Sequence, residues 1–209
     1  MSRRSIEKSI RLWTEREVRA RSNWRRYVRR KSKSPRRAFW YGKYRAAQVR
    51  VRYRRRQLRR YLPKGVSDKG LSFIQKYEGF RARPYRDTHG KWAIGYGDTR
   101  GIGPNTRPIT RKKAARKLKR RLDRDFFPAI RLLPTFEQLS QDQVDALLSF
   151  TYNVGPGALS DQTRVGRALR RGALRKAADG LLDWDKSEGK VLAGLSKRRR
   201  AERSLFLRA

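Results

Sequence analysis

The sequence has no cysteine and one histidine, and carboxylates are scarce: 57 Lys and Arg stand against 18 Asp and Glu in 209 residues. The missing cysteines exclude disulfides, thiolate metal sites and cysteine nucleophiles. No apolar run approaches the roughly 20 residues that cross a bilayer. Near the start, charged residues interrupt every apolar stretch before it reaches the length of about seven that a secretory signal needs. We therefore expect neither a membrane span nor a signal peptide.

The positive charge is unevenly distributed. Residues 1–66 hold 25 Lys and Arg against 3 Asp and Glu, a charge of +22, whereas residues 67–209 hold 32 against 15, a charge of +17. A field of this density favours an anionic partner, either nucleic acid, anionic lipid or an anionic polymer of the bacterial envelope. The alternative is a solubilising, partly disordered tail.

Two helices are expected in the basic segment, because apolar residues recur at helical spacing on either side of a break at Lys31 to Pro35. The two helices can form an antiparallel hairpin with a thin apolar seam. We place a basic helical extension at residues 1–64 and a globular domain at residues 65–209. The recurring apolar residues are Ile6, Ile10, Trp13, Ala20, Trp24 and Tyr27, then Trp40, Tyr44, Ala47, Val51, Leu58 and Leu62.

The globular part has the pattern of an α+β domain, with a small sheet beside a mostly helical lobe. Ser67 or Asp68 can cap a first helix, which Gly79 is suited to end. Glycines and short apolar stretches over residues 84–103 predict a hairpin or three-strand sheet. Thr110 can cap a further helix, and Ser140 with Gln143 forms a capping box. Later helices are expected over residues 163–171, 173–184 and 196–207.

Glu78 and Asp87 form a candidate pair for glycoside hydrolysis, which usually needs one protonated and one ionised carboxyl group. Glu78 falls in the last turn of its helix between Tyr77 and Phe80, where the helix dipole and the exclusion of water both favour its protonated form. Asp87 falls in a polar turn, which favours its ionised form. A carboxylate pair of this kind is also common in proteins that catalyse nothing. His89, in the same turn, is interpreted as a solvated residue rather than a catalytic base.

Three ordered motifs supply more specific information. The first comprises Tyr77-Glu-Gly-Phe80, Pro84-Tyr-Arg-Asp87 and Gly90-Lys-Trp-Ala-Ile-Gly-Tyr-Gly97. The second runs from Gln143 to Gly155 and the third from Gly194 to Glu202. Together they resemble the phage-type lysozymes, glycoside hydrolase family 24, over roughly residues 67–209.

The resemblance implies a two-lobed muramidase, an endolysin that cleaves between N-acetylmuramic acid and N-acetylglucosamine without a metal or other cofactor and as a monomer. Glu78 would be the general acid, and Asp87 would hold the attacking water or stabilise the transition state. Either Arg198 or Arg199 would pair with Glu78. The residues expected to contact substrate are Tyr96, Asp98, Asn153 and Gly155, although Gly155 can also simply end a helix.

Two residues depart from the family pattern. Ala93 stands where the family usually has a threonine that positions the nucleophilic water, and Asp98 stands where it often has histidine. The water must then be held by other groups, such as Asp87 with Asp98 or Thr99, or activity is reduced.

We expect residues 1–62 to bind anionic polymers or lipid of the envelope, with nucleic acid as a competing partner. The enzyme would be made in the host cytoplasm and would reach the wall through a holin-type lesion. The alternatives are a virion-borne lysozyme used in cell entry and an attenuated or non-catalytic envelope- or nucleic-acid-binding protein.

Overall fold

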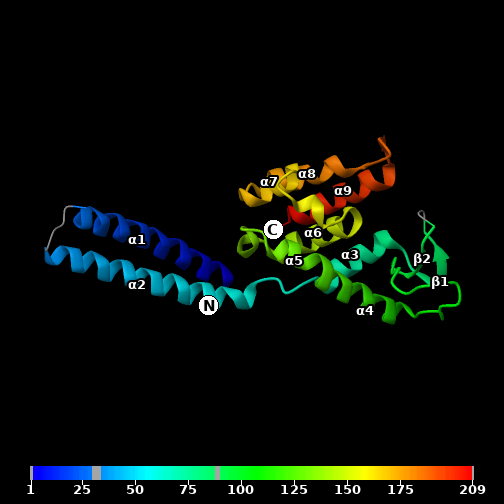
Figure 1. The fold of residues 1–209 in the computed structure, drawn as a ribbon, viewed down its shortest axis with the longest axis horizontal. Helices are drawn as coiled ribbons and strands as arrows, with labels where there is room; N and C mark the ends of the chain where they lie inside the picture. Colours follow the sequence, from blue (N-terminus) through cyan, green and yellow to red (C-terminus); the bar gives the residue numbers. More distant parts are fainter. Residues whose placement is uncertain (1, 30–33, 88–89, 209) are drawn as a thin grey trace. The chain divides into compact units, whose positions relative to one another are not determined.

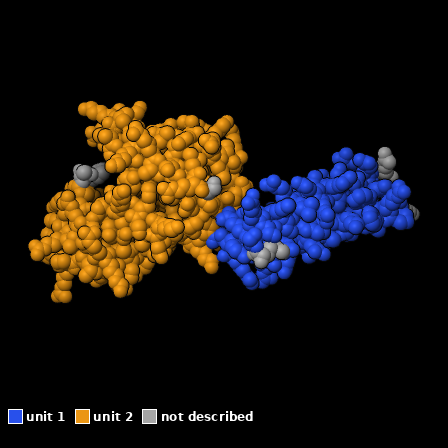
Figure 2. Space-filling model, turned by 180° about the vertical axis from the view of Figure 1, so that it is seen from behind, with its two compact units in different colours: residues 1–62 blue, residues 63–209 orange. Residues whose placement is uncertain are grey.

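The structure is a computed structural model that describes residues 2–29, 34–87 and 90–208. The chain divides into two compact units, residues 1–62 and 63–209, which Figure 2 shows in blue and orange. Each unit is described by itself. The interpretation of His89 falls outside the described residues.

The first unit is an antiparallel hairpin of two helices, α1 (Arg3–Arg29) and α2 (Pro35–Leu58), followed by a 3-10 turn at Arg59–Tyr61 (Figure 1). Ser34 caps α2 by accepting a hydrogen bond from the Arg36 amide. The seam between the helices is thin, as the spacing predicted. Its buried residues are Ile6, Ala20, Ala47, Val51 and Leu58.

Aromatic rings and guanidinium groups widen this seam. The guanidinium of Arg16 lies 4.6 Å from the centre of the Trp13 ring, and that of Arg50, from the other helix, lies 5.1 Å from it. Trp24 stacks on Tyr44 with ring centroids 5.9 Å apart. The Arg50–Trp13 contact, in which a cation gains from the face of an aromatic ring, and the Trp24–Tyr44 stack join α1 to α2 where few aliphatic side chains do so.

The second unit is mostly helical with two small sheets, which confirms the predicted α+β class. Each sheet is an antiparallel pair of strands, β1 with β2 and β3 with β4. The α-helices and strands are α3 (Asp68–Glu78), β1 (Arg81–Arg86), β2 (Trp92–Gly95), α4 (Arg111–Arg121), α5 (Phe127–Arg131), α6 (Gln141–Val154), α7 (Arg164–Arg170), α8 (Leu174–Leu181), β3 (Lys186–Ser187), β4 (Lys190–Val191) and α9 (Ala193–Phe206). A π-helical turn occupies Leu122–Phe126, and 3-10 turns occupy Phe136–Gln138, Pro156–Leu159 and Leu182–Trp184.

Four of the predicted helix ends are confirmed, whereas α9 begins three residues before the expected start at 196 and α8 ends at Leu181 rather than at 184. Ser67 caps α3 and Thr110 caps α4, each through its side-chain oxygen. Ser140 and Gln143 form both hydrogen bonds of the capping box of α6. Gly79, with φ of 66°, ends α3 in a conformation that a residue with a Cβ rarely adopts.

The sheets differ from the prediction. β1 begins at Arg81, three residues before the segment expected to form the sheet. It pairs with β2 through backbone hydrogen bonds, and the pattern of apolar residues could not predict where this pairing begins. The β3–β4 hairpin was not predicted. Its turn residues Glu188 and Gly189 both have positive φ, the signature of a two-residue hairpin turn.

Helix α6 is the centre of the second unit and packs against α3, α5 and α9 (Figure 1). Residues 143–151 of this helix are all buried. A helix buried on every side must satisfy its polar groups with partners from its neighbours. This arrangement brings charged side chains of α3 and α9 together beside α6.

Candidate active site

Glu78 is the last residue of α3, and Gly79 turns the chain from it into β1. Its side chain is 18% exposed. The neighbouring Phe80 ring packs against Tyr96, with centroids 5.6 Å apart. The Glu78 side chain is therefore largely buried, with Oε1 fully shielded from solvent.

Arg198 is the cation beside Glu78. Its Nη2 lies 2.8 Å from Glu78 Oε1, and the contact is ionic rather than a directed hydrogen bond. Arg198 is itself held in place, since its Nη2 donates to the Ser149 carbonyl at 3.1 Å and its Nε donates to Glu202 at 3.1 Å. Between the two arginines left open by the sequence, it is Arg198 that contacts Glu78.

Glu202 contacts Arg198 and is fully buried, as is Arg199. Its Oε2 is 2.8 Å from Arg199 Nε, and its Oε1 accepts a hydrogen bond from the Ser149 hydroxyl at 2.6 Å. Burial raises the pKa of Glu202, against the lowering effect of Arg199. Sequence reasoning gave Glu202 no role; its i, i+3 and i, i+4 spacing from the two arginines was the available signal.

Asn153 is held from the same cluster. Its Oδ1 accepts a hydrogen bond from Arg199 Nη2 at 2.9 Å, so a buried arginine orients an exposed amide. Gly155 ends α6 with φ of 88°, and its amide donates to the Thr151 carbonyl. Of the two roles that the sequence allowed for Gly155, ending a helix and contacting substrate, the structure shows the first.

Asp87 lies in the turn after β1, at the opposite end of that strand from Glu78 along the chain. Its Oδ1 accepts a hydrogen bond from the Lys91 amide at 2.8 Å, and its own amide donates to the Lys91 carbonyl. These bonds fix the orientation of a half-buried carboxyl group.

Tyr96 and Asp98 follow β2. Tyr96 is 8% exposed, and its carbonyl accepts a hydrogen bond from the Tyr152 hydroxyl at 2.9 Å, which joins this segment to α6. Asp98 pairs with Lys117 at 2.8 Å. It faces a groove whose other lining residues are Arg100, Lys117, Arg120, Arg121 and Arg124.

The structure thus connects Glu78, Arg198, Arg199 and Asn153 through one chain of contacts centred on Glu202. Tyr96 and Asp98 belong to a second group around Tyr152 and Lys117. Within the described part of the chain, no cluster of three or more Asp, Glu or His side chains could hold a metal ion, and no helix is long and apolar enough to cross a membrane.

A helical lobe with a small sheet, and a glutamate at the end of the helix before that sheet, define the lysozyme-like class. Residues 75–202 match the family model described as phage lysozyme. The chain is 39% identical over 146 residues to the endolysin of Bacillus phage B103, covering 68% of this chain and 54% of that protein. It is 35% identical over 148 residues to the endolysin of Salmonella phage P22, covering 68% and 97%.

Solved structures agree. A P22 lysozyme variant superposes with a TM-score of 0.59 at 34% identity, covering 68% of this chain and 98% of that one. The muramidase domain of SpmX from Asticaccaulis excentricus superposes with a TM-score of 0.58 at 32% identity, covering 69% of this chain and 99% of that one. The chain belongs to the phage lysozyme family and is a glycoside hydrolase of that family.

Proposed function

We propose that this chain is an endolysin that hydrolyses the β-1,4 bond between N-acetylmuramic acid and N-acetylglucosamine in peptidoglycan. Glu78 is the general acid in this proposal, and Asp87 is the second carboxylate. The observation that carries it is the contact of Glu78 with Arg198 at the end of α3, in a chain whose residues 75–202 match the phage lysozyme family.

The chemistry follows from how the two carboxyl groups are held. A proton donor must keep a fixed position relative to the oxygen that leaves, because small displacements at a transition state cost much rate. Arg198, fixed by Ser149 and Glu202, keeps Glu78 in place. The Lys91 amide does the same for Asp87.

Ala93 bears on how the water is positioned. It is 1% exposed on β2, opposite Tyr85, so this position supplies a buried methyl group and no hydroxyl. Asp98 is engaged by Lys117. In our proposal Asp87 is the main group that holds the attacking water, and the rate is lower than a threonine at position 93 would allow.

The decisive experiment is the release of reducing sugar ends from purified peptidoglycan. Glu78→Gln should abolish release, and Asp87→Asn should reduce it strongly, while both variants keep the wild-type melting temperature within a few degrees. Glu188→Gln, the same change at an exposed turn, is the matched control. Full activity of Glu78→Gln would refute the proposal.

The hairpin of residues 1–62 binds the anionic envelope in this proposal and raises the local concentration of the enzyme there. Its support is the charge of +22 over residues 1–66. Since salt screens such attraction, the full chain should bind cell walls more tightly than residues 63–209 at low salt and equally at high salt. Equal binding under both conditions would exclude this role.

The enzyme reaches the wall after another protein opens the membrane, or as a component of the virion. Both routes use the same chemistry. Detection of the chain in purified particles would establish the second route, and its absence there would favour the first.

A further inference from the structure

Helix α2 carries apolar residues on two faces. The inner face, with Trp40, Ala47, Val51 and Leu58, packs toward α1. A second set recurs at intervals of three and four residues on the outside of the hairpin, and we call it the outer stripe. Its members are Phe39, Gly42, Ala46, Val49 and Tyr53.

The outer stripe is exposed. Phe39 is 54% exposed, Val49 is 64% and Tyr53 is 57%. At 3.6 residues per turn, the five positions fall within an arc of roughly 80°, centred roughly 140° from the inner face. A two-helix hairpin needs only one apolar face on each helix, so the second face of α2 is not explained by its packing against α1.

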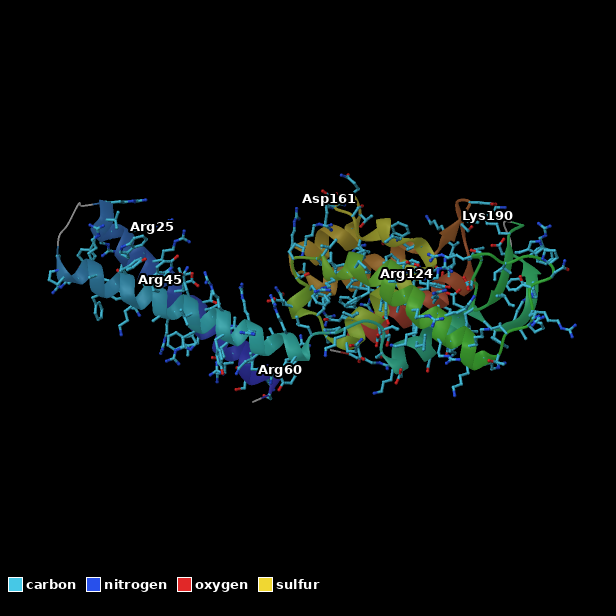
Figure 3. The ribbon with its side chains drawn as sticks, turned by 60° about the horizontal axis from the view of Figure 1, so that its bottom comes forward. Arg25, Arg45, Arg60, Arg124, Asp161 and Lys190 are labelled. Atoms are coloured by element: carbon cyan, nitrogen blue, oxygen red, sulfur yellow. The ribbon has the colours of Figure 1, made fainter. Side chains whose placement is uncertain are left out.

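Basic side chains border the stripe on both sides. Arg45, Arg52 and Arg56 follow one border, and Lys43 follows the other, while the guanidinium of Arg50 is turned toward Trp13 of α1. Figure 3 shows Arg45 among the side chains that project from the hairpin. Helix α2 has no Asp or Glu, and neither does any position between Glu17 and Asp68, where twenty Lys and Arg occur.

This charge determines what can cover the stripe. A second copy of the hairpin, residues 1–62, would bring its own charge of +21. It would be repelled, because like charges at contact distance oppose association. The occupant that suits the bordering cations is anionic.

Among anionic partners, the apolar centre of the surface favours lipid. Phe39 and Tyr53 are separated by about 21 Å of helix, and the stripe residues between them, Gly42, Ala46 and Val49, have no ring on which a base could stack. These residues also have no side-chain donor for a phosphate. Apolar residues flanked by Lys and Arg match the boundary between acyl chains and anionic headgroups.

We propose that α2 lies flat on an anionic lipid surface, with the outer stripe at the acyl boundary and the bordering Arg and Lys at the lipid phosphates. The inference rests on the proposed role of the hairpin in binding the envelope, and it identifies the envelope component as lipid. It places the enzyme at the membrane that adjoins its substrate.

The test is binding of the full chain to vesicles of phosphatidylglycerol and phosphatidylcholine, measured by co-sedimentation. The stripe variant combines Phe39→Ser, Val49→Ser and Tyr53→Ser, which leaves the charge unchanged. The control variant combines Leu12→Ser, Val18→Ser and Val28→Ser, which are exposed apolar residues of α1. Circular dichroism checks that both variants keep their helices.

We expect the stripe variant to bind anionic vesicles at least about tenfold more weakly than wild type, and the control variant to bind within about threefold of it. Wild type should bind vesicles of phosphatidylcholine alone far more weakly, because the bordering cations then have no net anionic surface. Equal binding of the stripe variant and wild type would overturn the proposal. The proposal would also be overturned if the stripe variant lost affinity for duplex DNA as strongly as for anionic vesicles, since the occupant of the stripe would then be nucleic acid.

Two further measurements separate this inference from the proposed function. Wild type and the stripe variant should hydrolyse isolated, lipid-free peptidoglycan equally. If wild type did not hydrolyse it, the proposed enzymatic function would be refuted and the lipid inference would not. Salt-sensitive binding of wild type to isolated walls without binding to anionic vesicles would preserve the envelope role and refute the lipid assignment.

Discussion

Replacing Ser67 by Ala tests how the helix that carries Glu78 is anchored. The Ser67 hydroxyl caps α3 by accepting a hydrogen bond from the Gly70 amide at 3.0 Å, and it donates to Asp145 Oδ2. The Ser67 amide donates to Asp145 Oδ1 at 2.9 Å. Asp145, on α6, is 1% exposed. One side chain therefore both begins α3 and satisfies a buried carboxyl group.

The cost of the substitution has two parts. Loss of a serine cap costs about 1 kcal/mol. Loss of one donor to a buried carboxylate costs about 1–3 kcal/mol. The expected decrease in the free energy of unfolding is therefore about 2–4 kcal/mol, which lowers the melting temperature of a domain of this size by about 4–16 °C.

The second part depends on pH. Burial raises the pKa of Asp145, while the hydrogen bonds from Ser67 lower it. A group whose pKa is raised in the folded state contributes stability that is complete below its ordinary value, about pH 4, and is lost as the pH rises through the folded-state pKa. Ser67→Ala raises this pKa further. The loss of unfolding free energy in Ser67→Ala should therefore be about 1 kcal/mol, the cost of the lost cap, below about pH 4. It should grow toward neutral pH.

The assay is urea unfolding of wild type and variant at about pH 4 and about pH 8. Ser72→Ala, in the same helix, removes an exposed hydroxyl that bonds the Asp68 carbonyl and should change stability by less than about 0.5 kcal/mol. An equal deficit for Ser67→Ala at both pH values would refute the role of Asp145. A deficit no larger than that of Ser72→Ala would refute the anchoring argument as a whole.

Three shorter predictions follow. Burial raises the pKa of Tyr152 to about 12, so ultraviolet titration of Tyr152→Phe should lack a step near that pH while keeping the ordinary tyrosine titration near pH 10. Glu202→Gln should lower kcat about 10- to 100-fold by loosening Arg198, and kcat equal to wild type would exclude a positioning role. Ala93→Ser adds a hydroxyl with little volume and should raise the rate of peptidoglycan hydrolysis; an unchanged or lower rate would contradict the view that the missing hydroxyl limits activity.

Local signals in the sequence were sufficient for several elements of the fold. Ser67, Thr110 and Ser140 begin helices because each satisfies an amide within three residues of itself. Gly79 ends a helix because it adopts positive φ without strain. The β3–β4 hairpin was missed because its strands are two residues each and show no apolar alternation.

Contacts between distant segments required the tertiary structure. Arg198 and Arg199 are adjacent in sequence, and both lie in a basic motif, so the sequence left the partner of Glu78 open. The packing of α9 against α6 turns Arg198 toward Glu78 and Arg199 toward Asn153. The contacts of Glu202 with the two arginines are local to α9, whereas its hydrogen bond from the Ser149 hydroxyl needs the packing of α9 against α6.

The sequence by itself determined the capped helix ends, the concentration of positive charge before residue 67 and the order of the family motifs, because each is a property of neighbouring residues or of composition. The tertiary structure decided which charges meet beneath the candidate acid and which face of α2 stays uncovered. The physical reason is that a buried charge needs a partner within a few ångströms, and the partner of Glu78, Arg198, lies far away along the chain and is placed only by the packed helices.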